Sequence, residues 1–420
     1  MADEIRVGLI GAGTNTKKRH IPGLEAHNGV EIVAVANRTR ESGEKVAKEF
    51  EIPKVYDSWL EIIDDEDIDA VCIGTWPYMH APMTIAALEA GKHVLVEARM
   101  AMNSEEAREM LAVSKANPDL VAQIVPAPHT LSVDRAIIEM ITSGYIGDLV
   151  NVRLSVGAGS GFPNWDSPLH WRHDRDLSGN NIMSMGIWYE ALMRWTGPAT
   201  TVQTLGQAVV NHRKDESGRR RAITIPDQID ILCRMATGGT LNMSVTTASG
   251  FAPSLEAWVY GSEGTLRLEQ IEGTIDGGLP VLRLTAGKRG EKAMKEVPVA
   301  AEKRGKWRVE EEFISAINGE EPVTHTNFYD GVKYMEWTDA VSEALQTGAT
   351  VHLPLLDNPD GRTFPARSRR SRSRVYPFVT YPMSDPPTAW RDWQSGDGFD
   401  YHQGACNHDR SGLDRALGDQ

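Results

Sequence analysis

The N-terminal part of the chain alternates short apolar runs with amphipathic stretches, and this alternation limits the possible folds more than any other feature. The runs are "IRVGLIGAG", "VEIVAVANR", "DAVCIGT", "HVLVEA" and "VAQIVP". Continuous apolar runs are typical of parallel strands that are covered on both faces. The stretches between them carry helix signals, such as Asn103 followed three residues later by Glu106. We therefore expect residues 1–125 to form a doubly wound α/β domain of the Rossmann type.

The pattern changes near residue 148. Runs such as "LVNVRLSVGAG", "QIDILCRMA" and "GTLNMSVTTA" follow one another with few helices between them, and turn signals such as "TGG" and "GSEG" join them. We expect residues 126–356 to form an α+β domain with a large, mostly antiparallel open sheet for substrate binding and oligomerisation. Residues 212–222 are expected to be an exposed loop. Residues 357–420 contain no Lys, Glu or Ile and are rich in Arg, which favours a poorly ordered tail.

Charge and hydropathy exclude several classes of protein. The formal net charge is -14, which argues against a nucleic-acid-binding face. No apolar run approaches the roughly 18 residues of a membrane span. The start of the chain, "MADEIRVGLI", lacks the features of a secretory signal, and the three cysteines lie far apart. We expect a cytoplasmic protein with a small-molecule substrate.

A glycine-rich turn follows the first predicted strand. In "GLIGAGTNT", Gly11 and Gly13 have the spacing of a dinucleotide fingerprint, in which the first glycine forms the turn and the second lets the backbone approach the pyrophosphate. Thr16 stands where a third glycine is usual. We predict cofactor contacts from Gly11, Gly13, Thr14, Asn15 and Thr16 at the start of the following helix.

The end of the second strand bears on the choice of cofactor. NAD-binding proteins usually carry an acidic residue there for the ribose 2′-hydroxyl. This chain has Asn37 and Arg38, in "NRTR". An arginine can pair with the 2′-phosphate of NADP. We predict NADP, with NAD possible; alternatively, Arg38 and Arg40 are only solvated residues at a helix start.

The third and fourth strands end in further candidates for cofactor binding: Thr75, Trp76, His80, Glu97 and Arg99. Arg99 could clamp a cofactor phosphate or an anionic substrate group, because a guanidinium stays protonated. The segment "HWRHDRD" (170–176) is rich in His and Asp. Such loop residues are more commonly solvated than metal-bound, so we predict no metal site.

Taken together, these motifs resemble the Gfo/Idh/MocA family, named for glucose–fructose oxidoreductase, inositol dehydrogenase and a rhizopine-catabolism protein. The resemblance covers about residues 4–355 and rests on the longer segments listed here: "DAVCIGTWPYMHAPMTIAALEAGKHVLVEARMA", "IIEMITSGYIGDLVNVRLS", "MGIWYEALMRW" and "VSEALQTGATVHLP". It implies a Rossmann domain followed by an α+β domain, NAD(P)-dependent chemistry on sugars, cyclitols or polyols, and a homodimer or homotetramer assembled through the open sheet.

Two positions depart from the family pattern. Where the family usually has Glu-Lys-Pro, this chain has Glu97, Ala98 and Arg99. The family often has Asp-x-Gly-x-His on a helix, whereas this chain has Ser184 and Trp188 around Gly186. Both groups that customarily move the substrate proton are therefore missing.

Other groups have to supply the proton transfer. By chain position the candidates are His129, which follows the fifth strand, His173 and Tyr189, with His129 first. Arg172, Asn181 and Trp188 are candidates for substrate binding, because an amide and an aromatic face suit a polyol. Glu190 lies about 200° from Trp188 around the predicted helix and is expected to point elsewhere.

Three function classes stay open from the sequence. The first is an NADP-linked oxidoreductase of sugar-like compounds. The second is a hydrolase or lyase in which bound nicotinamide cycles within one turnover. The third is a protein that binds the dinucleotide without catalysis.

Overall fold

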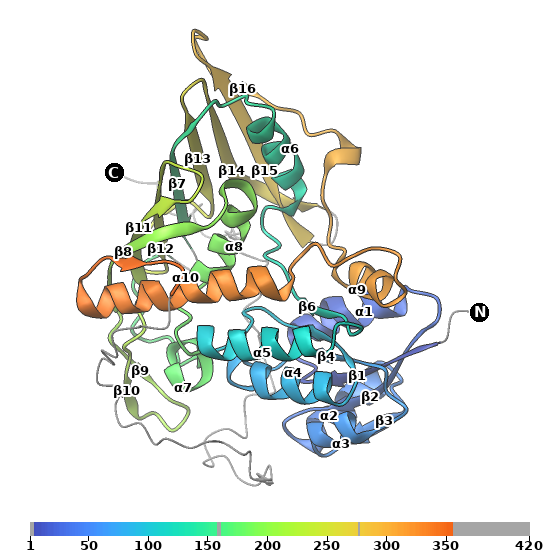
Figure 1. The fold of residues 1–420 in the computed structure, drawn as a ribbon. Helices are drawn as coiled ribbons and strands as arrows, with labels where there is room; N and C mark the ends of the chain where they lie inside the picture. Colours follow the sequence, from blue (N-terminus) through green and yellow to red (C-terminus); the bar gives the residue numbers. More distant parts are fainter. Residues whose placement is uncertain (1–3, 158–160, 276–277, 356–420) are drawn as a thin grey trace, which may run out of the picture.

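The computed structural model describes residues 4–157, 161–275 and 278–355, and the predicted tail at 357–420 lies outside them. Two large sheets with associated helices form most of the molecule (Figure 1). The first sheet has six parallel strands in the order β3-β2-β1-β4-β5-β6. Its strands are β1 (Ile5–Ile10), β2 (Val30–Ala36), β3 (Lys54–Tyr56), β4 (Ala70–Ile73), β5 (His93–Val96) and β6 (Ala122–Ile124). This is the predicted doubly wound sheet, with β3 as an additional edge strand.

Helices join these strands with the expected caps. They are α1 (Ile21–Glu25), α2 (Arg40–Glu49), α3 (Trp59–Asp64), α4 (His80–Glu89) and α5 (Ser104–Ala116), and a π-helical turn over Thr16–His20 precedes α1. The Asn103 side chain accepts from the backbone N–H of Glu106, so α5 begins where the sequence predicts. The Glu106 carboxylate in turn accepts from the N–H of Met102 at 3.0 Å.

The second sheet has nine strands in the order β16-β15-β14-β13-β7-β12-β11-β8-β17. Neighbours run antiparallel except β7 and β12, which are parallel. The strands are β7 (Leu149–Gly157), β8 (Ala199–Gln207), β11 (Gln228–Met235), β12 (Thr240–Thr246), β13 (Glu256–Gly261), β14 (Gly264–Ile275), β15 (Leu279–Lys288), β16 (Lys295–Glu296) and β17 (Val351–His352). The predicted fold class, a Rossmann sheet plus a mostly antiparallel open sheet, is confirmed.

The remaining helices connect the two sheets. They are α6 (Leu131–Thr142), α7 (Arg175–Ser178), α8 (Met185–Thr196), α9 (Val309–Ile317) and α10 (Phe328–Thr347). α10 contacts both α5 and β8, and α9 packs against α1 (Figure 1). Phe313 and Ile314 of α9 share a buried cluster with Val7 of β1. α9 therefore returns to the first sheet.

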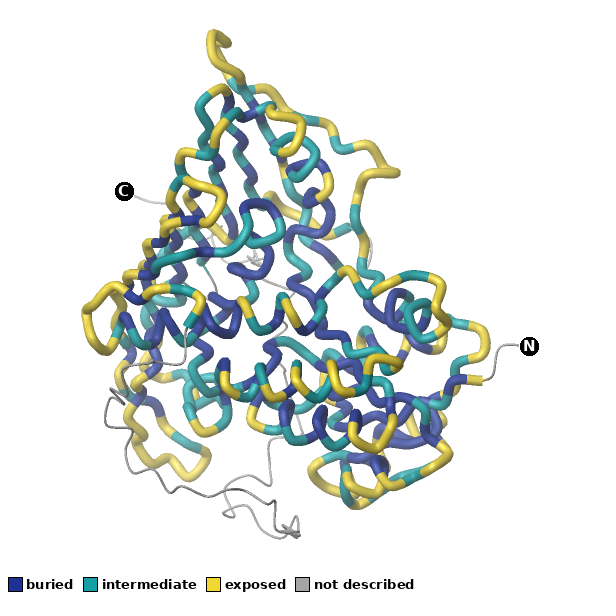
Figure 2. Tube along the Cα trace, in the orientation of Figure 1, coloured by how far each residue is buried: buried dark blue, intermediate teal, exposed yellow. Residues whose placement is uncertain are grey.

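One face of the second sheet carries no helix. Along β11, Ile229 and Ile231 are buried, whereas the alternate residues Asp230 and Leu232 are exposed. Leu205 and Leu232 are 78% and 50% exposed, and their neighbours on this face include Gln203 and Asp230. Figure 2 shows that buried segments concentrate where helices and sheets meet. This face therefore mixes leucines with polar side chains.

The charged connector is also different from the expected loop. Residues 212–222 form a two-stranded antiparallel hairpin of β9 (His212–Lys214) and β10 (Arg220–Ala222). The expectation of an exposed position holds for β10, whose three residues are all exposed.

In the part of the chain that the structure describes, no helix is long and apolar enough to cross a membrane.

Candidate cofactor and catalytic site

The glycine turn follows β1 at the switch point of the first sheet, where β1 and β4 are neighbours and the strand order reverses. Gly11 has φ +83°, and a Cβ on it would lie 2.7 Å from the Thr75 side chain. Only glycine therefore fits this turn. Gly13 is exposed, and a Cβ on it would have no neighbour within 4 Å. This open backbone at the carboxyl edge of a parallel sheet fits the pyrophosphate of a dinucleotide.

Thr14, Asn15 and Thr16 follow the turn in different environments. Thr14 is exposed and Asn15 is half-buried, whereas Thr16 is only 1% exposed. The Thr16 hydroxyl donates to the carbonyl of Gly11 at 3.3 Å. Thr16 therefore holds the turn in shape, and its predicted contact with the cofactor does not fit its burial.

Asn37 and Arg38 occupy the end of β2, as predicted. The Asn37 amide oxygen accepts from the N–H of Ala12 at 2.7 Å and so fixes the glycine turn to β2. Arg38 is exposed, and its guanidinium lies 5.8 Å from the centre of the Trp76 ring. Among the described residues, no carboxylate lies within ion-pair distance of Arg38, whereas Arg40 pairs with Glu44 and Asp57. Arg38 therefore has the charge and exposure that a phosphate ligand needs.

Two tryptophans stack across this edge. The ring of Trp76, after β4, stacks on Trp171 with centroids 5.7 Å apart. The guanidinium of Arg172 lies 4.1 Å over the Trp171 ring. Arg172, which we predicted to bind substrate, thus stands beside the predicted cofactor edge. The segment that carries Trp171 belongs to the second domain, so both domains form this wall.

His80 is completely buried and does not face the crevice. Its Nδ1 lies 2.8 Å from the carbonyl of Arg99, and its Nε2 lies 2.9 Å from the carbonyl of Thr75. Burial lowers the pKa of this imidazole. His80 therefore ties the loop after β4 to the loop after β5, and its predicted contact with the cofactor is wrong.

Ala98 opens onto a small cavity. The space available to the centre of a water molecule is about 10 Å³, about enough for one water. Polar groups in its wall come from Arg99, Glu190, Thr326 and Tyr334, and apolar ones from Ala98, Val125, Ala127, Gly186 and Ile187. The cavity lies at the position where the resemblance implies a lysine.

Arg99 and Glu190 occupy positions that differ from the sequence-based expectation. Arg99 is 3% exposed, and its Cδ lies 3.5 Å from where a Cβ on Gly186 would be. It packs beneath α8, so it does not clamp a cofactor phosphate. Glu190 does not point away: its oxygens accept from the Ala127 N–H and the Thr326 hydroxyl, both at 2.8 Å. Glu190 is thus a buried carboxylate beside Ala98.

Glu97 belongs to a buried cluster of charged groups. One carboxylate oxygen accepts from the Asn15 amide and lies 3.0 Å from Nε2 of His20. Nδ1 of His20 lies 2.5 Å from Glu310 on α9. Burial opposes ionisation of Glu97, but the His20 ring and the Asn15 amide outweigh it and lower the pKa of the carboxyl. The structure brings the predicted residues Asn15 and Glu97 together, and sequence reasoning missed His20.

His129 and Trp188 meet in a stacked pair. Their ring centroids are 4.4 Å apart and the rings are inclined by 19°. His129 is half-buried, and Trp188 is 5% exposed. The pair places an imidazole on an aromatic surface at the end of the loop after β6.

The other two candidates for proton transfer do not fit. His173 accepts a hydrogen bond at Nδ1 from the His170 N–H, and burial, aided by Arg213, lowers its pKa to about 4. Tyr189 lies in the core, stacked on Trp337 at 4.1 Å, and its hydroxyl accepts from the Ala199 N–H. Burial raises the pKa of Tyr189, so neither group is suited to act as a base near neutral pH.

Asn181 is also a structural residue. It is 1% exposed, and its amide donates to the carbonyls of Ala101 and Ser178 at 3.1 and 2.7 Å. The prediction that Asn181 binds substrate is therefore wrong, because both N–H donors serve to join the segment before α8 to the loop after β5.

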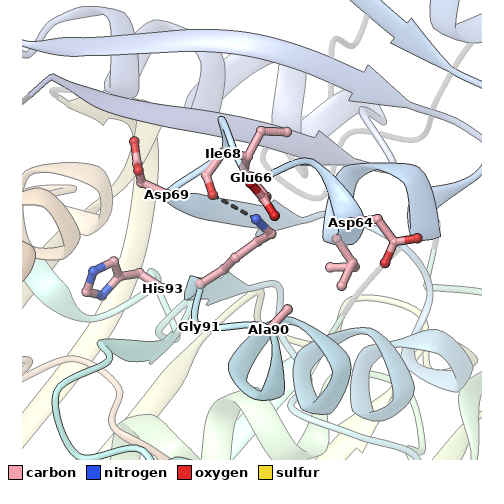
Figure 3. Close-up of a pocket in the computed structure, with 9 residues that line it drawn as sticks. Asp64, Glu66, Ile68, Asp69, Ala90, Gly91 and His93 are labelled. Carbon is pink, nitrogen blue, oxygen red and sulfur yellow. Dashed lines mark hydrogen bonds between the residues drawn. The ribbon is translucent and has the colours of Figure 1, made fainter.

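A hollow larger than the cavity at Ala98 lies at the opposite edge of the first sheet. The space in it that is open to the centre of a water molecule is about 520 Å³, and the hollow adjoins the starts of β4 and β5. Figure 3 shows Asp64, Glu66, Asp69 and His93 around it. Lys92 there donates to the carbonyls of Asp65 and Ile68. Parallel sheets bind ligands at the carboxyl ends of their strands, so this hollow is not the predicted site.

No arrangement of three or more His, Cys, Asp or Glu side chains within residues 4–157, 161–275 and 278–355 could hold a metal ion. The segment "HWRHDRD" illustrates why. His170 and His173 use ring nitrogens to accept backbone N–H groups of their own turn, and Asp174 caps α7.

Comparisons with known proteins agree with this geometry. Residues 5–123 match the profile of the Gfo/Idh/MocA oxidoreductase family with an NAD-binding Rossmann fold, and residues 135–267 match the profile of its C-terminal domain. An uncharacterized oxidoreductase of Synechocystis is 24% identical over 84% of this chain and 97% of its own length. The 1,5-anhydro-D-fructose reductase of Ensifer adhaerens is 33% identical over 42% of this chain and 52% of that enzyme.

A solved structure shares the fold over nearly its whole length. Levoglucosan dehydrogenase, in complex with NADH and L-sorbose, superposes with a TM-score of 0.72 at 21% identity, covering 83% of this chain and 99% of that protein. The two profiles together span the Rossmann sheet and most of the open sheet. The chain belongs to the Gfo/Idh/MocA family of oxidoreductases, and it carries both the NAD-binding Rossmann domain and the C-terminal domain of that family.

Proposed function

We propose that this protein is an NADP-linked oxidoreductase of a sugar, cyclitol or related polyol. The observation that carries the choice of cofactor is Arg38, an exposed guanidinium at the end of β2 that has no carboxylate partner among the described residues. A free guanidinium favours a phosphate, and no acidic side chain at the end of β2 is available for a ribose hydroxyl. Relatives that act on sugars, such as 1,5-anhydro-D-fructose reductase, support the substrate class.

The groups that would hold the cofactor come from four neighbouring strand ends, those of β2, β1, β4 and β5. The turn at Gly11 and Gly13 offers open backbone to the pyrophosphate. Arg38 and Trp76 stand on the side of the adenosine, where Trp76 adds an aromatic wall. Asn15 is fixed by Glu97, which follows β5. When bound, the nicotinamide ring would accept the hydride of the substrate carbinol.

In the proposed site, His129 receives the substrate proton. His129 is half-buried, whereas Tyr189 lies in the core and His173 accepts a hydrogen bond within its own turn and has a lowered pKa. Histidine titrates nearest neutral pH among the ordinary side chains. Trp188 fixes the plane of the imidazole by stacking and offers an aromatic surface to the C–H groups of a sugar.

Equilibrium titration with NADP⁺ and NAD⁺ tests the proposal, followed by a screen of sugars and polyols for formation of reduced cofactor. We expect saturable binding of both cofactors, tighter for NADP⁺, and turnover with at least one polyhydroxylated substrate. Absence of binding by either cofactor would refute the proposal.

A further inference from the structure

A buried histidine lies between two buried carboxylates beside the predicted cofactor crevice. His20 has no exposed surface, and the side chains of Glu97 and Glu310 are 16% and 3% exposed. Nε2 of His20 lies 3.0 Å from Glu97, and Nδ1 lies 2.5 Å from Glu310. We call these three residues the His20 cluster. The mechanism proposed above does not use it.

Hydrogen bonding defines the charges of the His20 cluster. Glu310 accepts from the indole N–H of Trp307 at 2.8 Å through its second oxygen, and Glu97 accepts from the Ala98 N–H at 3.1 Å. Both carboxylates therefore face donors only, which is the environment of the ionised form. Two carboxylate partners at its two nitrogens require His20 to donate from both, so the ring is an imidazolium. One cation between two anions leaves one excess negative charge.

The pKa directions agree with this assignment. Burial acts to lower the pKa of His20, but interactions with Cys72, Glu310 and Glu97 outweigh it and raise that pKa well above its ordinary value. Burial opposes ionisation of Glu97, but the His20 ring, the Asn15 amide and the Ala98 N–H outweigh it and lower the pKa of that carboxyl. Burial weakens solvent screening, so the excess charge acts over a longer distance than it would at the surface.

The His20 cluster is close to where the nicotinamide would lie. Glu97 follows β5, in the half of the sheet beyond the β1–β4 switch point, and this half receives the nicotinamide in a doubly wound fold. Its partner Asn15 belongs to the turn that faces the pyrophosphate. Glu97 thus carries the negative charge to the crevice, while His20 and Glu310 lie behind it.

Nearby cations do not cancel this charge. The Arg19 guanidinium lies 4.4 Å over the Trp307 ring and is only half-buried, so solvent screens it. The buried Arg99 lines the small cavity at Ala98 together with the buried carboxylate of Glu190. Counted over His20, Glu97 and Glu310, the cluster carries one excess negative charge.

We propose that the His20 cluster makes this protein bind oxidised nicotinamide cofactor more tightly than reduced cofactor, and so makes the bound reduced cofactor a stronger hydride donor. The inference rests on the proposed function. The oxidised nicotinamide ring is a cation and the reduced ring is neutral, so a nearby fixed anion stabilises only the oxidised form. A larger dissociation constant for the reduced form than for the oxidised form means that the bound cofactor has a lower reduction potential than the free cofactor.

Glu310→Gln tests this, because Glu310 is buried behind His20 and does not face the crevice. Dissociation constants of NADP⁺ and NADPH are measured for both proteins, at a pH where ¹⁵N NMR of labelled histidine shows His20 as an imidazolium in each. We expect the preference for NADP⁺ to fall about fivefold or more in the variant. Glu44→Gln, which removes an exposed carboxylate on α2, is the control and should leave the ratio unchanged.

Other outcomes of these measurements would overturn either this inference or the proposed function. A Glu310→Gln variant that weakens both cofactor forms equally would assign the cluster a purely structural role and overturn the inference. A neutral His20 ring in the unaltered protein would also overturn it, because the charge count would then be different. Failure of the unaltered protein to bind either cofactor form would refute the proposed function instead, and the NMR measurement would still report the charge of His20.

Discussion

Replacing Arg38 with alanine should remove most of the preference for NADP over NAD. Arg38 is exposed, lies 5.8 Å over Trp76 and lacks a carboxylate partner among the described residues, so it can turn to a 2′-phosphate without first breaking an ion pair. A charge-assisted hydrogen bond contributes about 1.5–3 kcal/mol. Because solvent screens an exposed group, we expect the lower end of that range, about tenfold in affinity.

Arg40 provides a matched control two residues away. Its guanidinium is held by Glu44 at 3.0 Å and Asp57 at 3.1 Å, so Arg40→Ala should change NADP⁺ affinity by less than about threefold. The assay is calorimetric titration of each protein with NADP⁺ and NAD⁺ at two salt concentrations. The effect of Arg38→Ala on NADP⁺ should shrink at high salt, and its effect on NAD⁺ should be small. Equal affinities of the unaltered protein for both cofactors would refute the argument.

Three further predictions follow from the site. His129→Ala should lower kcat at least about a hundredfold with little change in NADP⁺ affinity, whereas Tyr189→Phe should keep kcat; steady-state kinetics would contradict this if the two variants behaved alike. Trp171→Ala should weaken cofactor binding severalfold, because the stack on Trp76 is lost; unchanged dissociation rates in stopped-flow fluorescence would argue against a shared wall. His20→Gln should lower the free energy of unfolding by about 3–5 kcal/mol, since two buried carboxylates lose their cation. His20 stabilises the folded protein while its ring is protonated, and because its pKa is raised, this stabilisation is lost as the pH rises through the folded-state pKa. Urea unfolding should therefore show that the difference in unfolding free energy between the two proteins shrinks as the solution becomes alkaline.

Local sequence patterns predicted the fold well. The glycine turn, the order of apolar strands and the cap at Asn103 depend on neighbours in the chain, and each is found where the pattern places it. The hairpin at 212–222 was missed because charged residues hide its pairing, and β3 was missed because it has only three residues.

The site depends on contacts that no local pattern encodes. His20 and Glu310 are 290 residues apart in sequence, and their pairing requires α9 to return to α1. Glu190 was expected to point elsewhere, but α8 makes contacts through both residues: Trp188 stacks on His129, and Glu190 lines the cavity at Ala98. Tyr189 was misjudged because its partner in the core, Trp337, comes from α10.

Assembly remains a prediction. Leu205 and Leu232 are exposed on the uncovered face of the second sheet, and burial of such leucines would favour a homodimer or homotetramer. Light scattering at micromolar concentration tests this. A monomer mass would contradict it, and Leu232→Asp should dissociate the assembly if the leucines lie in the interface.

The most direct test of the central claim is a turnover measurement that follows product and reduced cofactor together. Purified protein is mixed with NADP⁺ and a panel of sugars and polyols, and the absorbance of reduced nicotinamide is compared with the amount of oxidised product. We expect one reduced cofactor for each product molecule. Product without net reduced cofactor would identify a hydrolase or lyase that cycles its nicotinamide, and tight NADP⁺ binding without any product across the panel would contradict a catalytic role.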